Sequence, residues 1–273
     1  MTGRLLVTGG TGYLGSELLR RAPAIGAWHT REPPGGGDWL RLDVRDPAAV
    51  RRALERLRPA AVIHTAYRQD DRATTLDGAA AVATAAAAVE ARLLHVSTDV
   101  IFDGTKAGPY TEEDPPSPIT DYGRAKADAE RAVRTAHPGA LIVRTSLIYG
   151  GREPSRHERT ACEAAQGRGG MAFFEDELRS PVLVGDLASA LLELSGREEA
   201  GILNVAGPDT ISRYEFAVLL AQAHGRSGER ILRSRLAGSG LVRPANCALD
   251  SSRARALLRT RLRGVRESAP PPP

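Results

Sequence analysis

Three residues in the middle of the chain have the types and the spacing needed to give a proton to a carbonyl oxygen. Tyr122 and Lys126 are four residues apart, so they share one face if the segment is helical. An ammonium beside a phenol favours the tyrosinate and lowers the pKa of the phenol from its ordinary value of about 10. Thr98 follows an apolar run and would hold the carbonyl oxygen against that phenol. The pattern predicts a carbonyl reductase with Thr98, Tyr122 and Lys126 as its catalytic residues.

A carbonyl reductase also needs a hydride donor, and the amino-terminal segment offers a place for one. A glycine-rich turn follows the apolar run 5–7 and precedes a helical pattern, which is the context that dinucleotide-binding turns require. Gly9 permits the tight turn, Gly12 lets the backbone approach a pyrophosphate, and Gly15 lets the helix pack close to the strand. The helix N-terminus then offers unpaired N–H groups to the phosphates. The cofactor residues expected here are Gly9, Thr11, Gly12, Tyr13, Leu14 and Gly15.

Together the two motifs resemble the extended short-chain dehydrogenase/reductase family, and within it the dTDP-4-dehydrorhamnose reductase-like branch that binds sugar nucleotides. Residues 95–104, HVSTDVIFDG, are similar to the STD-x-VFDG motif of that branch, and residues 109–114 are similar to its PYxExD loop. The resemblance runs from residue 3 to about residue 258, with further landmarks in family order at 144–150, 179–188, 201–207, 243–244 and 249–253.

Alternating strand and helix patterns predict the α/β class, with a Rossmann-type, doubly wound parallel sheet and a small C-terminal substrate lobe. The predicted strands are 4–8, 24–30, 42–44, 60–65, 93–97 and 140–144. The predicted helices are 12–21, a helix capped by Asp46 with Pro47 at its first position, 79–91, and one carrying Tyr122 and Lys126. We expect residues 1–150 to form the NAD(P)-binding domain with the catalytic residues. Residues 151–273 would mainly form the lobe, with about 182–206 returning to the sheet and a disordered proline-rich tail near 268–273.

The residues after the second predicted strand indicate which cofactor binds. NAD-preferring sites usually place Asp or Glu there to bind the ribose 2′-hydroxyl. This chain has Thr30 and Arg31 instead, and an arginine fork suits a 2′-phosphate, although a plain surface arginine is the alternative. We therefore expect NADP (as NADPH), with NAD as the second choice. The resemblance adds residues beside the adenine, ribose and nicotinamide: Asp43, Val44, Thr65, Ala66, Tyr67, Tyr122 and Lys126.

Substrate residues are expected at the active-site strand end and in the lobe. Arg179 and Arg243 suit a nucleotide-sugar diphosphate, with structural salt bridges as the alternative. The expected substrate set is Thr98, Asp99, Val100, Tyr122, Arg179 and Arg243. Residues 151–159, expected as a polar loop, depart from the resemblance: in rhamnose synthesis an aromatic side chain in this region holds the substrate. The chemistry is therefore better defined than the substrate.

The resemblance implies an NAD(P)H-dependent oxidoreductase of nucleotide-sugar metabolism that reduces a keto group, foremost that of a nucleotide-linked 4-keto-6-deoxysugar. Three alternatives stay open: a nucleotide-sugar epimerase or dehydratase, a natural-product ketoreductase, and a non-catalytic NADP-binding regulatory subunit like that of methionine adenosyltransferase. A dehydratase usually needs extra acid and base residues beside the threonine, and Asp99 is a candidate. The intact Thr98, Tyr122 and Lys126 set argues against the regulatory subunit.

The other ionisable residues have simpler expectations. His157, Glu158 and nearby Cys162 lie on a polar segment, where surface positions are more common than a metal site, so we expect no metal. His64 and His95 lie on predicted buried strands and are expected to be satisfied core histidines.

Composition indicates which classes of partner and which cellular compartment to expect. The chain has 37 basic and 33 acidic residues, and their interspersed charges give no nucleic-acid-binding stripe. No apolar run approaches the length of a membrane span, and we expect no signal peptide, because the apolar run 5–7 is too short for one. The two isolated cysteines suit free thiols in a reducing cytoplasm, with a disulfide as the alternative. We expect a cytoplasmic protein that binds a small-molecule substrate and neither nucleic acid nor membrane; a homodimer is compatible with the sequence.

Overall fold

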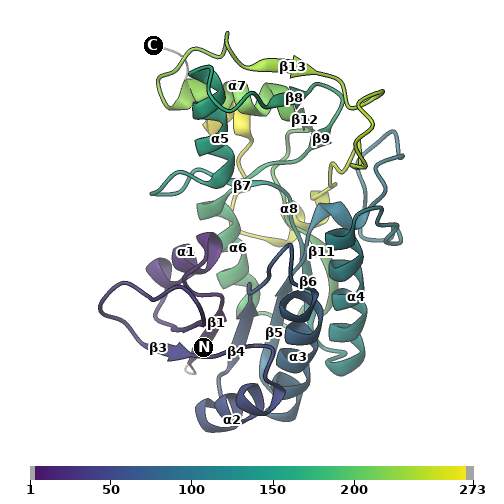
Figure 1. Cartoon of the computed structure of the whole chain (residues 1–273). Helices are drawn as coiled ribbons and strands as arrows, with labels where there is room; N and C mark the ends of the chain where they lie inside the picture. The colour runs from purple at the N-terminus through teal and green to yellow at the C-terminus, as the bar shows by residue number, and fades with distance from the viewer. Residues whose placement is uncertain (1–3, 269–273) are drawn as a thin grey trace.

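One parallel sheet lies at the centre of the protein in the computed structural model, which describes residues 4–268 (Figure 1). Its seven strands are β1 (Leu5–Thr8), β2 (Ile25–Trp28), β3 (Trp39–Arg41), β4 (Ala61–His64), β5 (Arg92–Val96), β6 (Leu141–Arg144) and β11 (Gly201–Asn204). They lie in the order β11–β6–β5–β4–β1–β2–β3, and every neighbouring pair is parallel. The central strands are mostly apolar because both of their faces are buried, and their polar residues, such as His64 and His95, are buried too. This arrangement confirms the predicted α/β class and the doubly wound sheet.

The third strand lies earlier in the chain than predicted. We expected it at 42–44, but β3 pairs with β2 through Gly26 opposite Trp39. A Cβ atom at Gly26 would lie 2.4 Å from the Trp39 ring, so glycine makes room for the tryptophan. Leu42 and Val44 instead bury their side chains beyond the end of the strand. Their apolar character marked burial and not strand pairing.

Helices cover both faces of the sheet. The bounds are α1 (Tyr13–Arg21), α2 (Pro47–Leu57), α3 (Gly78–Ala88), α4 (Asp121–Ala136), α6 (Val184–Ser195) and α8 (Ser252–Leu257). On one face α2, α3 and α4 pack in a core cluster that includes Val82, and on the other α1 and α6 pack in a cluster that includes Leu18. As predicted, Asp46 caps α2: its Oδ1 accepts a hydrogen bond of 3.0 Å from the N–H of Ala49.

A smaller lobe lies beyond the carboxyl ends of the strands, at the top of Figure 1. Its helices α5 (Arg156–Ala165) and α7 (Arg213–Ala223) share a core with Phe173 and Phe216. Three strand pairs extend this region: β7 (Ile148–Tyr149) with β10 (Val182–Leu183), β8 (Ala172–Phe174) with β13 (Leu232–Ser234), and β9 (Leu178–Arg179) with β12 (Ile211–Ser212). The short helices are η1 (Ala73–Asp77, π-helical), η2 (Asp99–Ile101) and α9 (Val265–Ser268).

After β10 the chain returns to the main sheet through α6 and β11, and β11 pairs with β6 at the edge. The proline-rich tail lies outside the described residues, apart from Ser268 in α9. Between residues 4 and 268, no helix combines the length and the hydropathy that crossing a bilayer requires.

A buried ion pair fixes α4, the predicted catalytic helix, on the sheet. Arg144 on β6 donates hydrogen bonds of 2.9 to 3.3 Å to both carboxylate oxygens of Glu130 on α4. The two side chains are only 1% and 4% exposed. Removing one partner of such a pair leaves an uncompensated charge in the core.

We predict that Glu130→Ala lowers the free energy of unfolding by about 3–5 kcal/mol, because it leaves the Arg144 guanidinium buried without its carboxylate. Asp121→Ala is the matched control on the same helix: its pair with Arg124 is exposed and is worth about 0–1 kcal/mol. Urea unfolding followed by circular dichroism measures both. Equal losses in the two variants would contradict this role of the buried pair.

Candidate active site

A cleft of about 2080 Å³ opens between the sheet and the smaller lobe. It lies at the carboxyl ends of the strands, where the chain order reverses between β1 and β4. Open α/β sheets bind ligands at this topological position. Every residue predicted for the cofactor, for catalysis and for the substrate lines this cleft. The fold therefore brings together side chains that are up to 234 positions apart, from Gly9 to Arg243.

The glycine-rich turn has the geometry of a phosphate cradle. Gly9 has a φ of +69°, which favours glycine. A Cβ atom at Gly15 would lie 2.2 Å from the carbonyl oxygen of Gly9, so α1 packs against the turn only because Gly15 has no side chain. Gly12 caps α1 without a side-chain hydrogen bond, which leaves the first turn of the helix open to an anion. These residues fit the pyrophosphate of a dinucleotide.

Basic side chains gather at the other end of the turn, beyond β2. The exposed Arg31 donates a 3.4 Å hydrogen bond to the carbonyl oxygen of Thr11. Asp43 is already paired: Arg45 donates to its Oδ2 at 2.9 Å, and His29 lies 3.5 Å away. The hydrogen bonds from Arg45 hold the pKa of Asp43 below its usual value. The arrangement leaves Arg31 as an exposed cation at the cleft edge.

Close packing of α4 sets the position of the predicted acid. Thr120 caps the helix by accepting a 3.1 Å hydrogen bond from the N–H of Gly123. A Cβ atom at Gly123 would lie 2.3 Å from the carbonyl oxygen of Val100, so glycine lets the helix approach the loop after β5. Tyr122 therefore reaches the cleft beside Thr98, and the predicted helix carrying the Tyr122–Lys126 pair is confirmed.

The pKa of Tyr122 moves in the opposite direction to our prediction. Burial, followed by the nearby Tyr67 and Asp99, raises this pKa well above 10. Lys126 is not among the groups that shift this pKa, and its Nζ donates a 2.6 Å hydrogen bond to the carbonyl oxygen of Val96. Burial also lowers the pKa of Lys126 to about 8. Tyr122 thus keeps its proton at neutral pH, as a proton donor must.

Thr98 is held in place by its neighbour Asp99. The Thr98 hydroxyl donates to Asp99 Oδ1 at 3.2 Å and accepts from the N–H of Val100 at 3.4 Å. Ser146 donates to the other carboxylate oxygen at 2.6 Å, and Arg179 Nε lies 3.7 Å from it. Asp99 is 2% exposed, and burial raises its pKa. Both oxygens are engaged, so Asp99 positions Thr98 and does not present a free acid to the cleft.

The two predicted substrate arginines have different surroundings. Arg179 is 2% exposed and donates to Glu177 and to the carbonyl oxygens of Leu178, Ala245 and Pro244. These contacts support the structural alternative for Arg179. Arg243 makes one 2.9 Å hydrogen bond to Glu177, and its side chain is 44% exposed. Arg243 is therefore the member of the pair with donors left for a ligand.

The segment 151–159 is only partly a loop, because α5 begins at Arg156. Ser155 and Glu158 form a capping box, and the S-x-x-E sequence was the overlooked signal for it. Glu158 Oε2 also accepts hydrogen bonds from Gly150 at 3.3 Å and from Tyr13 at 3.5 Å. Tyr13 in turn accepts a 2.7 Å hydrogen bond from the N–H of Gly151. The glycine-rich turn is thereby tied directly to the lobe.

The residues weighed as a metal site have other roles. Glu158 caps α5, and the His157 ring packs 6.3 Å from that of Phe216. Burial lowers the pKa of His157 to about 3. Cys162 and Cys247 are both free thiols. Over residues 4–268 no group of three or more His, Cys, Asp or Glu side chains is placed to hold a metal ion.

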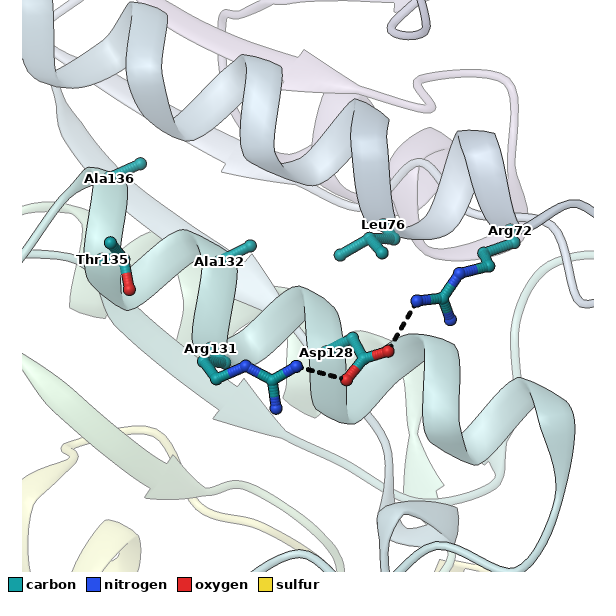
Figure 2. Close-up of a pocket in the computed structure, with 7 residues that line it drawn as sticks. All are labelled: Arg72, Leu76, Asp128, Arg131, Ala132, Thr135 and Ala136. Atoms are coloured by element: carbon teal, nitrogen blue, oxygen red, sulfur yellow. Dashed lines mark hydrogen bonds and ion pairs between the residues drawn. The ribbon is translucent and has the colours of Figure 1, made fainter.

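A second hollow of about 430 Å³ lies between η1 and α4, away from the cleft (Figure 2). Asp128 lies between Arg72 and Arg131 and accepts a hydrogen bond of 2.7 Å from each of them. Leu76, Thr135 and two alanines supply the rest of its lining. The Asp128 carboxylate is already paired, so the hollow offers no free acid or base comparable to Tyr122 in the cleft.

Comparison with known proteins agrees with this geometry. The family model for the RmlD substrate binding domain matches residues 3–270. The chain belongs to this family. A dTDP-4-dehydrorhamnose reductase of Mycolicibacterium smegmatis is 34% identical over 284 residues, which cover 98% of this chain and 84% of that protein. Methionine adenosyltransferase 2 subunit beta of Rattus norvegicus is 31% identical, with 97% of this chain and 86% of that protein covered.

Solved structures of this RmlD family are also similar over nearly the whole chain. The crystal structure of dTDP-4-dehydrorhamnose reductase from Bacillus anthracis in complex with NADP has a TM-score of 0.83 and 25% identity. The match covers 98% of this chain and 97% of that one. The likeness therefore includes both the sheet and the smaller lobe.

We predict that Lys126 loses its proton near pH 8 in the cofactor-free protein, because burial disfavours the ammonium and lowers its pKa. The chain has two lysines, so ¹³C-labelled lysine gives two side-chain signals, and Lys106→Arg assigns them. The Lys126 signal should shift as the pH rises through about 8. A midpoint near the ordinary lysine value of about 10.4 would contradict the buried placement of the ammonium.

Proposed function

We propose that the chain is an NADPH-dependent reductase of the 4-keto group of a nucleotide-linked 6-deoxysugar. The observation that carries this proposal is that one cleft is lined by the phosphate-cradling turn, by Thr98, Tyr122 and Lys126, and by basic residues of the lobe. The reductase relative of M. smegmatis and the NADP-bound reductase of B. anthracis support the same reaction and cofactor.

In this proposal each catalytic side chain has one task. A bound nicotinamide would supply the hydride. Tyr122 gives its proton to the sugar oxygen. Its raised pKa keeps this proton on the phenol at neutral pH until it is transferred. Thr98, oriented by Asp99, holds that oxygen beside the phenol. Lys126 remains an ammonium below about pH 8 and stabilises the charge left on Tyr122.

The cofactor preference rests on the cleft edge beyond β2. Arg31 is exposed there, and Asp43 is already occupied by Arg45. A guanidinium at this point would pair with a 2′-phosphate through its planar fork. No acidic residue precedes Arg31 at the end of β2 to bind a ribose 2′-hydroxyl instead. These features favour NADPH over NADH.

The substrate class rests on the lobe side of the cleft. Arg243 and Arg156 line it there, and each presents donors that suit a diphosphate. Pro244 restricts the backbone of Arg243 to extended conformations and so limits where the guanidinium can reach. A nucleotide-linked sugar is therefore a better fit than an uncharged ketone. A cytoplasmic location and a homodimer stay predictions from the sequence.

We predict that Tyr122→Phe lowers kcat by about 10²–10⁴-fold, because it removes the proton donor but keeps the ring. The dissociation constant for NADPH should change little, and fluorescence titration of NADPH measures it. Near-full activity in this variant would move the acid to another residue. Absence of activity in the unmodified chain with any keto-sugar nucleotide would instead favour the alternative of a non-catalytic regulatory subunit.

We predict that Arg243→Ala raises the Michaelis constant for the nucleotide sugar by about tenfold or more, because a charge-assisted contact is worth about 1.5–3 kcal/mol. The matched control is Arg235→Ala, an arginine of the same lobe that is 69% exposed, pairs with Glu175 and lies outside the cleft. The Michaelis constant for NADPH should stay the same in both variants. Equal Michaelis constants for the sugar in the two variants would favour a smaller, uncharged ketone.

A further inference from the structure

Two stacked histidines lie in the sheet, and one of them contacts Lys126. His64 on β4 and His95 on β5 are opposite each other in the sheet, and each is 1% exposed. Their ring centroids are 5.3 Å apart with an interplanar angle of 21°. His64 Nδ1 lies 2.7 Å from the Thr8 hydroxyl, and His95 Nε2 lies 3.4 Å from Lys126 Nζ. Burial and the charge of Lys126 lower the pKa of both rings, so both are neutral.

The contact between Lys126 and His95 fixes where the imidazole proton must be. An ammonium has donors only, so His95 Nε2 must accept, and the proton of the neutral ring must be on Nδ1. His95 Nδ1 has no hydrogen-bond partner among the described residues. A buried donor without a partner costs about 1–3 kcal/mol. His64 Nε2 also has no partner among the described residues, so the histidines are not the fully satisfied core residues that the sequence predicted.

We propose that His95 is a positioning residue of the reductase: its Nε2 lone pair and the Val96 carbonyl oxygen together form the seat of the Lys126 ammonium behind Tyr122. The effect of this role on catalysis rests on the proposed function. The contact between His95 and Lys126 does not. These two acceptors favour the charged form of Lys126, although Lys126 is only 3% exposed. They also hold the ammonium back from the open cleft.

The other groups around Lys126 do not replace this acceptor. Glu130, one turn along α4, raises the pKa of Lys126 but is paired with Arg144. Tyr67, whose ring centre is 5.9 Å from Nζ, is a face contact, and His64 stacks behind His95. Tyr122 stays protonated in this state. Among the groups that face Lys126, Val96 and His95 thus supply the two acceptor atoms.

The test uses the cofactor-free protein with ¹³C-labelled lysine, and compares His95→Leu with His95→Gln. Leu removes the acceptor and should lower the Lys126 midpoint by about one pH unit, because a hydrogen bond to a charged group is lost. Gln can place an amide oxygen near the position of Nε2 and should restore most of that shift. His64→Leu is the matched control: it removes an equally buried ring without contact to Nζ and should leave the midpoint nearly unchanged.

A measurement on the unmodified protein keeps the proposal open to refutation if a variant does not fold. Long-range ¹H–¹⁵N spectra of the histidine rings show which nitrogen carries the proton. Protonation of His95 at Nδ1 is expected, and protonation at Nε2 would overturn the proposal. An unchanged Lys126 midpoint in folded His95→Leu would overturn it too.

In activity assays, His95→Leu should move the alkaline fall of kcat/KM to lower pH, and His95→Gln should not. Failure of the reductase assay alone would leave the lysine titration intact, so the two claims are separable.

Discussion

An ammonium group buried at the carboxyl ends of β4 and β5 must be solvated mainly by the protein itself, because little of it is exposed to water. Lys126 is 3% exposed, and its contacts are a backbone carbonyl oxygen and an imidazole nitrogen. The same burial that lowers the pKa of Lys126 raises that of Tyr122. Tyr122 therefore starts protonated, and in the proposed reaction the Lys126 ammonium would stabilise the tyrosinate once the proton has left. Both side chains are largely buried because α4 packs closely on the sheet. Gly123 and the Arg144–Glu130 pair allow and stabilise this packing.

A second set of charges links catalysis to the lobe. Thr98 is oriented by Asp99, and Asp99 lies 3.7 Å from Arg179, which pairs with Glu177. Glu177 also accepts from Arg243, which faces the cleft. In the proposed reaction Thr98 would hold the carbonyl oxygen, and it is thus connected to the cleft wall where a diphosphate would bind. Substitution in this buried series, at Arg179 for example, is expected to affect folding before it affects recognition.

Much of the fold and of the site could be predicted from local patterns. The strand–turn–helix context of the glycine turn, the spacing of Tyr122 and Lys126, and the cap at Asp46 each depend on near neighbours in the chain. The sheet followed because alternating strands and helices allow few arrangements. The S-x-x-E box at Ser155 was equally readable, but its polar composition led us to predict a loop.

The errors have one physical origin, which is contact between distant segments. The position of β3 depends on Trp39 packing over Gly26, and the burial of Arg179 depends on carboxylates from other elements. The direction of the pKa shift of Tyr122 depends on how deeply α4 packs. The contact of His95 with Lys126 depends on how β5 and α4 meet. None of these has a periodic or short-range pattern in the sequence.

The central claim is that this cleft transfers a hydride from NADPH to a keto carbon of a nucleotide-linked sugar. The most direct measurement is a single turnover with NADPH deuterated at the transferring position of C4 and with dTDP-4-dehydrorhamnose, followed by mass spectrometry of the sugar product. The account predicts that the reduced sugar carries one deuterium at C4 and that Tyr122→Phe forms it far more slowly. Recovery of unreduced sugar, or of a reduced sugar without deuterium, would contradict the account.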